Sequence, residues 1–310
     1  MEPCGARSIP RRTAGDLRCR LPWYGESPEG LCCVHVLGRA RVNGTRKLFY
    51  ALLDRISYRS RHDSVFYRLA QAIVDRIKGD NSSDPVTNGE LAFLRNNLHD
   101  ADVVFDVGAN AGQWAQMCLR LNPRIHLHCF EPSRFTFREL ERVGLPPNVR
   151  LNHCGLGAAR DTSVLRIFEE GSGLNSLYVR TGVPGKAQED KTETIELETL
   201  DGYCATNGIR YVDLVKVDVE GHELQVLKGA ERMLRGSNIG LIQFEYGGCN
   251  IDARVFLRDI FDFVTTVSPK ARFFKLLPRR IVEVAAYTQK LETLQYSNYV
   301  VGIAKAPRGF

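Results

Sequence analysis

Residues 103–112 read VVFDVGANAG, and this stretch decides the class of fold. Its first five residues form a short apolar run that is typical of a buried strand. Gly108 follows this run, and the apolar residues Trp114, Met117 and Leu121 then recur at the three- and four-residue spacing of a helix. A buried strand that turns through glycine into a helix predicts the opening of a βαβ unit.

Strand and helix patterns continue to alternate along the rest of the chain. This alternation predicts an α/β fold in which helices connect parallel strands and cover both faces of a sheet. One continuous helix is expected from Leu224 to Leu234. We expect a doubly wound, mostly parallel seven-stranded sheet formed by residues 103–107, 125–130, 149–154, 211–218, 239–246, 273–277 and 299–303.

Three parts of the chain differ in composition. Residues 1–45 are rich in Arg, Gly, Cys and Pro without a sustained period, so we expect a poorly ordered basic segment. Residues 46–87 contain two amphipathic patterns and are expected to form a helical cap. Residues 88–310 carry the alternating pattern and are expected to form the main domain. Within it, residues 160–200 interrupt the alternation and suit an insertion that carries substrate contacts.

The charge is distributed unevenly along the chain. The 310 residues have a formal net charge of +6, but residues 1–80 contain 15 Lys and Arg against 8 Asp and Glu. The other residues contain 27 basic against 28 acidic side chains and are nearly neutral. The basic excess therefore does not indicate an acidic partner for the whole protein.

Cysteine usage and hydropathy indicate in which cellular compartment the protein is expected. The nine cysteines include no C-x-x-C pair, which excludes the usual zinc-ribbon spacing. Their odd number, and residues 1–20 without a leader-like apolar stretch, favour reduced thiols in the cytoplasm. No run of 18 apolar residues occurs, so no membrane-spanning helix is expected.

The turn after the first strand carries the first candidate binding residues. Asn110 stands at the second glycine position of the dinucleotide-binding order G-x-G-x-x-G, so that fingerprint is missing. The negative charge of Asp106 would repel a pyrophosphate but would attract a cationic or amine-bearing ligand. The methionine part of S-adenosylmethionine, with its ammonium and sulfonium groups, is such a ligand. The alternative is an ordinary turn between a strand and a helix.

A second candidate residue, Glu131, ends the second strand 25 residues after Asp106. At this position a carboxylate can accept hydrogen bonds from both ribose hydroxyls of a nucleoside. The alternative is an exposed Glu in front of a helix that starts near Pro132. The spacing from Asp106 favours the ribose site.

A third group lies on the fourth strand and the turn after it, in the sequence VKVDVEGHE (215–223). Strand alternation is expected to place Lys216, Asp218 and Glu220 on one side of the sheet. Charges at the carboxyl end of a strand fit a reaction site, because ligands of doubly wound folds bind along that edge. His222 follows at the mouth of the next helix, where an imidazole can act as a general base. The alternative is a structural ion-pair cluster with a helix-capping acid.

These motifs together resemble the FkbM family of S-adenosylmethionine-dependent methyltransferases. The resemblance covers residues 88–305 and rests on DVGANAG, FEP, TLD and, above all, DLVKVDVEGHELQVLKGAE (213–231). It implies the class I, Rossmann-like methyltransferase fold and the methylation of hydroxyls on sugars or polyketide-type natural products. It also implies that Glu131 holds the ribose and that Gly155 and Leu156 border the adenine. The cofactor loop would be lined by Asp106, Gly108, Ala109, Asn110 and Gly112.

The chemistry of methyl transfer defines the expected catalytic roles. The reaction is a displacement at a sulfonium carbon that depends on in-line alignment, and an alcohol needs help to lose its proton. We expect His222 to act as the base, with Asp218 close to the transferring methyl group. Glu220 is expected to orient the acceptor, with Lys216 in the same charged group. Alternatively, Asp218 and Glu220 could ligate a divalent metal ion that acidifies the hydroxyl.

The residues also suggest one further contact with the acceptor and two rival functions. Glu245, at the end of the fifth strand, is a further candidate for contact with the acceptor. A nucleic-acid methyltransferase could use the basic front segment as an electrostatic arm, but the chain lacks an Asn-Pro-Pro-Tyr-type tetrapeptide and has no Pro-Cys nucleophile in the catalytic region. A non-catalytic cofactor-binding protein would have little need for the charged residues 216–222. The sequence therefore favours a small-molecule or glycoside acceptor over a nucleic acid, and the apolar stripes of the front helices are compatible with a homodimer.

Overall fold

The chain divides into two compact units, residues 1–60 and residues 61–310. The computed structural model describes residues 44–57, 64–181 and 191–309. In the described part of the chain, no helix is long and apolar enough to cross a membrane.

The two front helices expected from the sequence are both present. Helix α1, Gly44–Ser57, is the described part of the first unit, whereas helix α2, Val65–Lys78, belongs to the second. The segment 46–87, expected as one helical cap, therefore extends over both units. Apart from the first residues of α1, the expected basic segment 1–45 lies outside the described residues.

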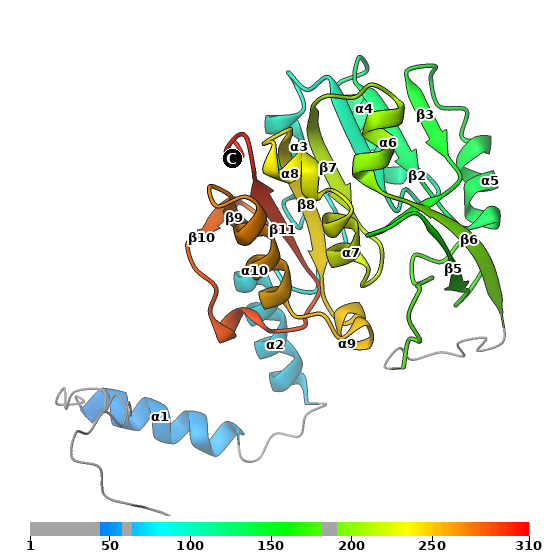
Figure 1. Cartoon of the computed structure of the whole chain (residues 1–310). Helices are drawn as coiled ribbons and strands as arrows, with labels where there is room; N and C mark the ends of the chain where they lie inside the picture. The colour runs from blue at the N-terminus through cyan, green and yellow to red at the C-terminus, as the bar shows by residue number, and fades with distance from the viewer. Residues whose placement is uncertain (1–43, 58–63, 182–190, 310) are drawn as a thin grey trace, which may run out of the picture. The chain divides into compact units, whose positions relative to one another are not determined.

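The second unit is built on an eight-stranded sheet (Figure 1). Five neighbouring strands run parallel in the order β3-β2-β1-β7-β8, and β11 runs antiparallel to both β8 and β9. The predicted doubly wound, mostly parallel sheet is therefore confirmed. The strands are β1 (Val103–Val107), β2 (His126–Phe130), β3 (Val149–Asn152), β7 (Val212–Val217), β8 (Ile239–Tyr246), β9 (Arg272–Leu277), β10 (Arg280–Val284) and β11 (Ser297–Gly302).

The sheet has eight strands rather than the predicted seven, because β10 adds an edge strand. β10 forms an antiparallel hairpin with β9, with Arg280 opposite Leu277 and Val284 opposite Phe273. Most of its residues are exposed or half-buried at the edge of the sheet. The segment RIVEV therefore does not show the alternation of buried and exposed residues that marks a half-buried strand.

Helices cover both faces of the sheet and bury two separate apolar cores (Figure 1). Successive side chains of the central strands point to opposite cores, as expected for a sheet that is buried on both sides. One face carries α3 (Glu90–Asn97), α4 (Gln113–Leu121) and α5 (Arg134–Arg142). The other face carries α6 (Leu200–Thr206), α7 (Glu223–Lys228), α8 (Glu231–Arg235) and α10 (Leu257–Val267). A short helix, α9 (Cys249–Ala253), follows β8, and a 3-10 turn, Gln289–Leu291, precedes β11.

The helix expected from Leu224 to Leu234 is instead the pair α7 and α8. The break falls at Gly229, where an added Cβ would lie only 2.0 Å from the carbonyl oxygen of Gly157. Only a residue without a side chain fits between the two backbones. The close approach comes from a distant loop, so the helical periodicity of the sequence does not reveal it.

A second, three-stranded sheet occupies the region in which the sequence alternation breaks. Its order is β4-β6-β5, with β4 at Gly155–Leu156, β5 at Asp161–Arg166 and β6 at Thr192–Glu198. Leu165 and Ile195 contribute to a small core of its own. Two of its three strands, β5 and β6, lie within the insertion predicted for residues 160–200.

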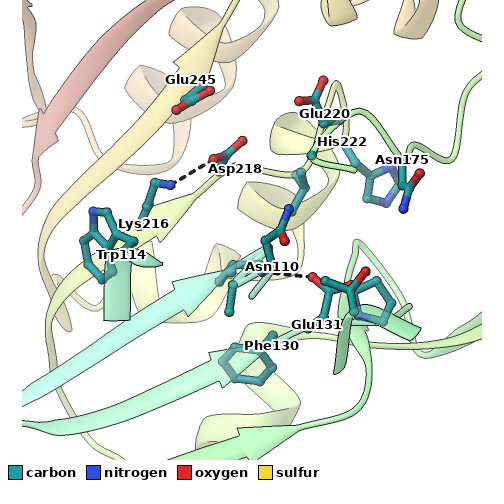
Figure 2. A pocket seen from close by; sticks show the side chains of 18 of the residues that line it. Asn110, Trp114, Phe130, Glu131, Asn175, Lys216, Asp218, Glu220, His222 and Glu245 are labelled. Carbon is teal, nitrogen blue, oxygen red and sulfur yellow. Dashed lines mark hydrogen bonds and ion pairs between the residues drawn. The ribbon is translucent and has the colours of Figure 1, made fainter. Parts of the chain in front are cut away.

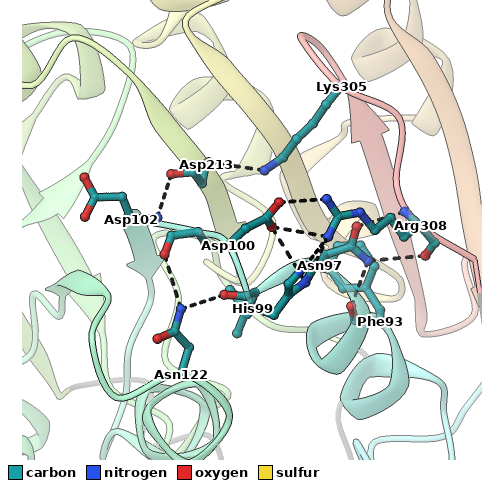
Figure 3. A network of polar contacts seen from close by, with 11 residues as sticks. Phe93, Asn97, His99, Asp100, Asp102, Asn122, Asp213, Lys305 and Arg308 are labelled. Carbon is teal, nitrogen blue, oxygen red and sulfur yellow. Dashed lines mark hydrogen bonds and ion pairs between the residues drawn. The ribbon is translucent and has the colours of Figure 1, made fainter.

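The C-terminal segment is bound at the amino ends of the parallel strands (Figure 3). Arg308 forms an ion pair of 2.7 Å with Asp100, and Lys305 forms one of 3.2 Å with Asp213. The other carboxylate oxygen of Asp213 accepts the backbone N–H of Asp102 at 2.9 Å, next to the start of β1. These contacts hold the amino ends of β1 and β7 together, so their carboxyl ends also lie side by side.

Candidate active site

A cavity of about 650 Å³ opens at the carboxyl ends of β1, β2, β7 and β8 (Figure 2). Its volume is in the range of small-molecule sites. Glu90 of α3 and Trp114 of α4 line one part of it, and residues 172–177 with the second sheet line another. The cavity therefore lies at the strand edge where doubly wound folds bind their ligands.

The residues predicted from separate motifs meet in this cavity. All four expected catalytic residues line it, namely Lys216, Asp218, Glu220 and His222. Six expected cofactor residues also line it, namely Gly108, Ala109, Asn110, Glu131, Gly155 and Leu156. The other two lie behind its wall: Asp106 is completely buried, and Gly112 packs toward Leu140 of α5.

Glu131 is fixed by the backbone on both sides. One carboxylate oxygen, Oε2, accepts the N–H of Asn110 at 3.0 Å, and the other, Oε1, accepts the N–H of Ser133 at 2.9 Å. Burial raises the pKa of the Glu131 carboxyl to about 7. Each carboxylate oxygen can accept a second hydrogen bond. Glu131 can therefore bind a ligand while its own position is held by the turn after β1.

Asp106 is a buried carboxylate whose oxygens have no hydrogen-bond partner within the described residues. Burial raises the pKa of Asp106 to about 7, although the nearby ammonium group of Lys216 opposes this shift. The two residues face each other on the neighbouring strands β1 and β7. A buried carboxylate without hydrogen bonds is costly. A cationic ligand group nearby would reduce that cost.

Lys216 and Asp218 form the charged centre of the cavity. Their Nζ and Oδ2 atoms lie 2.8 Å apart, and the Lys216 ammonium lies 5.9 Å from the centre of the Trp114 ring. Burial by itself would lower the pKa of Lys216, but the carboxylates around it, first Asp218 and then Glu90, hold that pKa well above its ordinary value. Lys216 therefore stays charged and neutralises part of the negative charge around it.

Glu90 and Gln243 are buried polar residues that the motifs did not indicate. The Nε2 atom of Gln243 donates to Oε1 of Glu90 at 2.5 Å, and Nε1 of Trp114 donates to the same oxygen at 3.1 Å. Gln243 could have been found from the sequence, because it is a polar side chain within the otherwise apolar first part of the strand IGLIQFEY. Glu90 has no such signal, since an acid in the first turn of a helix is common.

Glu245 lines the cavity at the end of β8. The Tyr296 hydroxyl donates to its Oε1 at 2.7 Å. Burial and then the charge of Asp218 raise the pKa of Glu245 well above its ordinary value, whereas Lys216 and Tyr296 act in the opposite direction. Figure 2 shows Glu245, Asp218 and Lys216 as one group in the cavity.

Glu220 lines the same cavity as Lys216 and Asp218, but the strand alternation from which it was placed does not reach it. The strand β7 ends at Val217, and Glu220 has a left-handed backbone with a φ of 53°, so the strand alternation stops before it. The carboxylate of Glu220 pairs with Arg180 at 2.5 Å. The two carboxylates expected as metal ligands are thus paired with different cations. Among the described residues, no group of three or more His, Cys, Asp or Glu side chains is placed to hold a metal ion.

His222 lies at the start of α7, apart from Asp218 and Glu245 (Figure 2). Its Nδ1 atom is 3.0 Å from the hydroxyl of Tyr178, and its Nε2 atom lies close to Gly157. Burial lowers the pKa of His222 to about 4, so the imidazole is neutral at pH 7. The side chain therefore borders the loop after β4, next to the residues expected at the adenine.

Residues 172–181 are bound to the turn after β7 by a hydrogen bond and an ion pair. The Ser176 hydroxyl donates to the backbone carbonyl of Glu220 at 2.8 Å. Arg180 pairs with the Glu220 carboxylate and, at 3.5 Å, with Asp252 of α9. These contacts hold one wall of the cavity. They join residues far apart in the sequence, so no local pattern predicts them.

Arg180→Ala is expected to lower the free energy of unfolding by about 2 kcal/mol, because it leaves two largely buried carboxylates without their cation. The side chain of Arg180 is only 10% exposed. The matched control, Arg142→Ala, removes an exposed ion pair with Glu139 and is expected to cost less than about 0.5 kcal/mol. Urea unfolding of both variants measures the difference. Equal destabilisation by the two substitutions would show that Arg180 does not fasten the wall.

The strand order, the glycine turn after β1 and the acid at the end of β2 define a class I, Rossmann-like methyltransferase architecture. The methyltransferase FkbM domain matches residues 106–270, which is more than half of the chain. The chain therefore belongs to the FkbM methyltransferase family, and the resemblance seen in the sequence is confirmed.

Relatives of the chain include proteins with assigned reactions. The 2-O-methyltransferase NoeI of Sinorhizobium fredii is 26% identical over 183 residues, which cover 55% of this chain and 74% of NoeI. The 31-O-demethyl-FK506 methyltransferase FkbM of Streptomyces tacrolimicus is 29% identical over 172 residues, which cover 46% of this chain and 65% of that protein. A crystal structure of methyltransferase FkbM from Methylobacillus flagellatus matches with 16% identity and a TM-score of 0.42, over 65% of this chain and 44% of that one. Each match thus spans only part of the relative.

Proposed function

We propose that this chain transfers a methyl group from S-adenosylmethionine to a hydroxyl of a sugar or natural-product acceptor. The observation that carries the proposal is one cavity that holds both Glu131, suited to a ribose, and the charged group formed by Lys216, Asp218 and Glu245. Membership of the FkbM family supports methyl transfer. The names of both relatives described above specify methylation of an oxygen.

The residues present fit S-adenosylmethionine as the methyl donor. The buried carboxylate of Asp106, which has no hydrogen-bond partner among the described residues, favours a ligand with an ammonium group nearby. Glu131 retains acceptor capacity for ribose hydroxyls, and Gly155 with Leu156 would border the adenine. When bound, this donor supplies an electrophilic methyl group on a sulfonium sulfur.

The acceptor is expected beside Asp218 and Glu245. Carboxylates accept hydrogen bonds from hydroxyls, and their negative charge disfavours an anionic acceptor. Asp218 is partly neutralised by Lys216, and its place at the end of β7 suits a position near the transferring methyl group. Glu220 is bound to Arg180, so we propose that it holds the cavity wall rather than the acceptor itself.

His222→Ala tests the base that the sequence predicts. Removal of a general base lowers turnover by about 10²–10⁴-fold. Because His222 borders Gly157 and has a lowered pKa, we expect instead a kcat within about tenfold of wild type and a higher KM for S-adenosylmethionine. Steady-state kinetics with varied S-adenosylmethionine separate these results. A large loss of kcat at unchanged cofactor affinity would establish His222 as the base.

The proposed function is tested by incubating the protein with methyl-deuterated S-adenosylmethionine and a panel of neutral glycosides and macrolide alcohols. We expect release of S-adenosylhomocysteine and a deuterated methyl group on an acceptor oxygen, detected by mass spectrometry. Transfer to RNA or DNA would instead support a nucleic-acid methyltransferase. Binding of the cofactor without turnover on any of these acceptors would support a non-catalytic binding protein. The cytoplasmic location and the homodimer remain predictions from the sequence.

A further inference from the structure

The Glu245 carboxylate has one oxygen that is held by the protein and one that is not. Its Oε1 atom accepts the Tyr296 hydroxyl at 2.7 Å. Among the described residues, its Oε2 atom has no hydrogen-bond partner. The residue lines the cavity beside Asp218. This geometry presents a fixed carboxylate with a free oxygen to a bound acceptor.

A chain of polar contacts fixes the Tyr296 side of this carboxylate. Asn298 lies opposite Glu245 in the β8–β11 register, and its Nδ2 atom donates to the Tyr296 hydroxyl oxygen at 3.3 Å. The Nε2 atom of Gln243 in turn donates to Oδ1 of Asn298 at 3.0 Å. Gln243 also donates to Glu90, which connects the chain of contacts to α3. The position of Glu245 is therefore determined from two strands and one helix.

The other candidate bases are less well placed. Asp218 has its Oδ2 atom on the Lys216 ammonium at 2.8 Å, so one of its two oxygens is already bound to a cation. His222 has its Nδ1 atom against Tyr178 and its Nε2 atom close to Gly157, away from the carboxylates. Of these three side chains, only Glu245 has one oxygen held by a neutral donor, the Tyr296 hydroxyl, and its other oxygen free in the cavity.

We propose that Glu245 is the general base that removes the proton of the acceptor hydroxyl, and that Tyr296 positions its carboxylate. This assignment rests on the proposed methyl transfer to a hydroxyl. The acceptor oxygen forms a bond to the methyl carbon while the methyl–sulfur bond breaks and leaves its electron pair on sulfur. The hydroxyl proton passes to Oε2 of Glu245. The products are the methyl ether, S-adenosylhomocysteine and protonated Glu245, which returns its proton to water.

The charges that face Glu245 support this role. Asp218 and Lys216 face it from β7 and its end, Glu90 from α3, and Tyr296 from the segment before β11. Burial and the two other carboxylates raise the pKa of Glu245, while Lys216 and the Tyr296 hydroxyl lower it, and the net shift is upward. A carboxyl with a raised pKa is a stronger base once it is ionised.

Glu245→Gln is the decisive variant, because it keeps the size of the side chain and an oxygen that can accept from Tyr296. With S-adenosylmethionine and methyl glycosides as probes, we expect kcat to fall by about 10²–10⁴-fold. The acidic limb of the kcat–pH profile, expected above the ordinary Glu range in the wild type, is expected to disappear. The affinity for S-adenosylhomocysteine is expected to stay within about threefold, since the ribose site is untouched. The matched control, Glu283→Gln, lies on the edge strand β10 and is expected to leave all these quantities unchanged.

Tyr296→Phe gives a second readout that a purely structural role would not produce. The Tyr296 hydrogen bond lowers the pKa of Glu245, so its loss is expected to move the acidic limb to higher pH. At a pH above that limb, kcat is expected to recover toward the wild-type value.

The outcomes separate this assignment from the proposed function. If the wild type turns over a methyl glycoside and Glu245→Gln does so equally well, the base assignment is overturned alone. A reduced kcat with the acidic limb intact would overturn it too, because Glu245 would then be only structural. If the wild type binds S-adenosylhomocysteine but methylates no alcohol, the proposed function fails and the base assignment fails with it.

Discussion

Glu131→Ala is expected to weaken the binding of S-adenosylhomocysteine by about 10²–10³-fold. The Glu131 carboxylate is proposed to accept two ribose hydroxyls, and hydrogen bonds to a charged group contribute about 1.5–3 kcal/mol each. The substitution also leaves the N–H groups of Asn110 and Ser133 without their acceptors, so the turn after β1 loses its support. A loss of about 3–4 kcal/mol corresponds to the stated range.

Calorimetric titration with S-adenosylhomocysteine at pH 8 measures this effect. The pH matters because burial raises the pKa of Glu131 to about 7, and above that pH the carboxylate is mostly ionised. Glu141→Ala, an exposed position on the neighbouring helix α5, serves as the control and is expected to bind like the wild type. Unchanged affinity in Glu131→Ala would remove the ribose from this position.

Gly108→Ala is expected to lower the free energy of unfolding by about 3–5 kcal/mol. Gly108 has a φ of 87°, and a side chain in that conformation costs about 1–3 kcal/mol. The added Cβ would also lie 1.8 Å from the carbonyl oxygen of Asp218, so β1 and the end of β7 would have to separate. Such overpacking adds about 1–3 kcal/mol. The displacement moves Asp218, so S-adenosylhomocysteine binding is expected to fall as well.

The contribution of the close contact can be isolated with a second glycine. Gly144 also has a positive φ, 66°, but an added Cβ there has nothing within 4 Å. Gly144→Ala is therefore expected to cost only the conformational strain, about 1 kcal/mol, with cofactor binding unchanged. Urea unfolding compares the two variants. A similar loss in both would mean that the approach of Gly108 to Asp218 is not tight.

The sheet and the proposed cofactor side of the cavity could be predicted from the sequence because their signals are local. Apolar runs end at Val107 and Phe130, and the acids Asp106 and Glu131 stand at these ends. The carboxyl ends of parallel strands meet at one edge, so these acids could be placed together without coordinates. The strand β10 could not be predicted, because an exposed edge strand needs no apolar face.

The proposed acceptor side of the cavity depends on contacts between distant parts of the chain. Glu245 binds Tyr296, 51 residues away, and Glu220 binds Arg180, 40 residues away. Neither pair has a spacing that a helix or strand would impose. The strand alternation that suggested one face for Lys216 and Glu220 does not extend to Glu220, because the strand ends between them. Sequence patterns therefore indicated which side chains are charged, but not which partners they have.

A crystal structure of the full chain with S-adenosylhomocysteine is the most direct test of the account. We predict that the ribose hydroxyls lie within hydrogen-bond distance of Glu131, with the adenine against Gly155 and Leu156. The sulfur is predicted to face Asp218 and Glu245, with room beside them for an acceptor hydroxyl. A cofactor bound outside this cavity, or one reversed so that the adenine lies at Glu245, would contradict the proposed methyltransferase site.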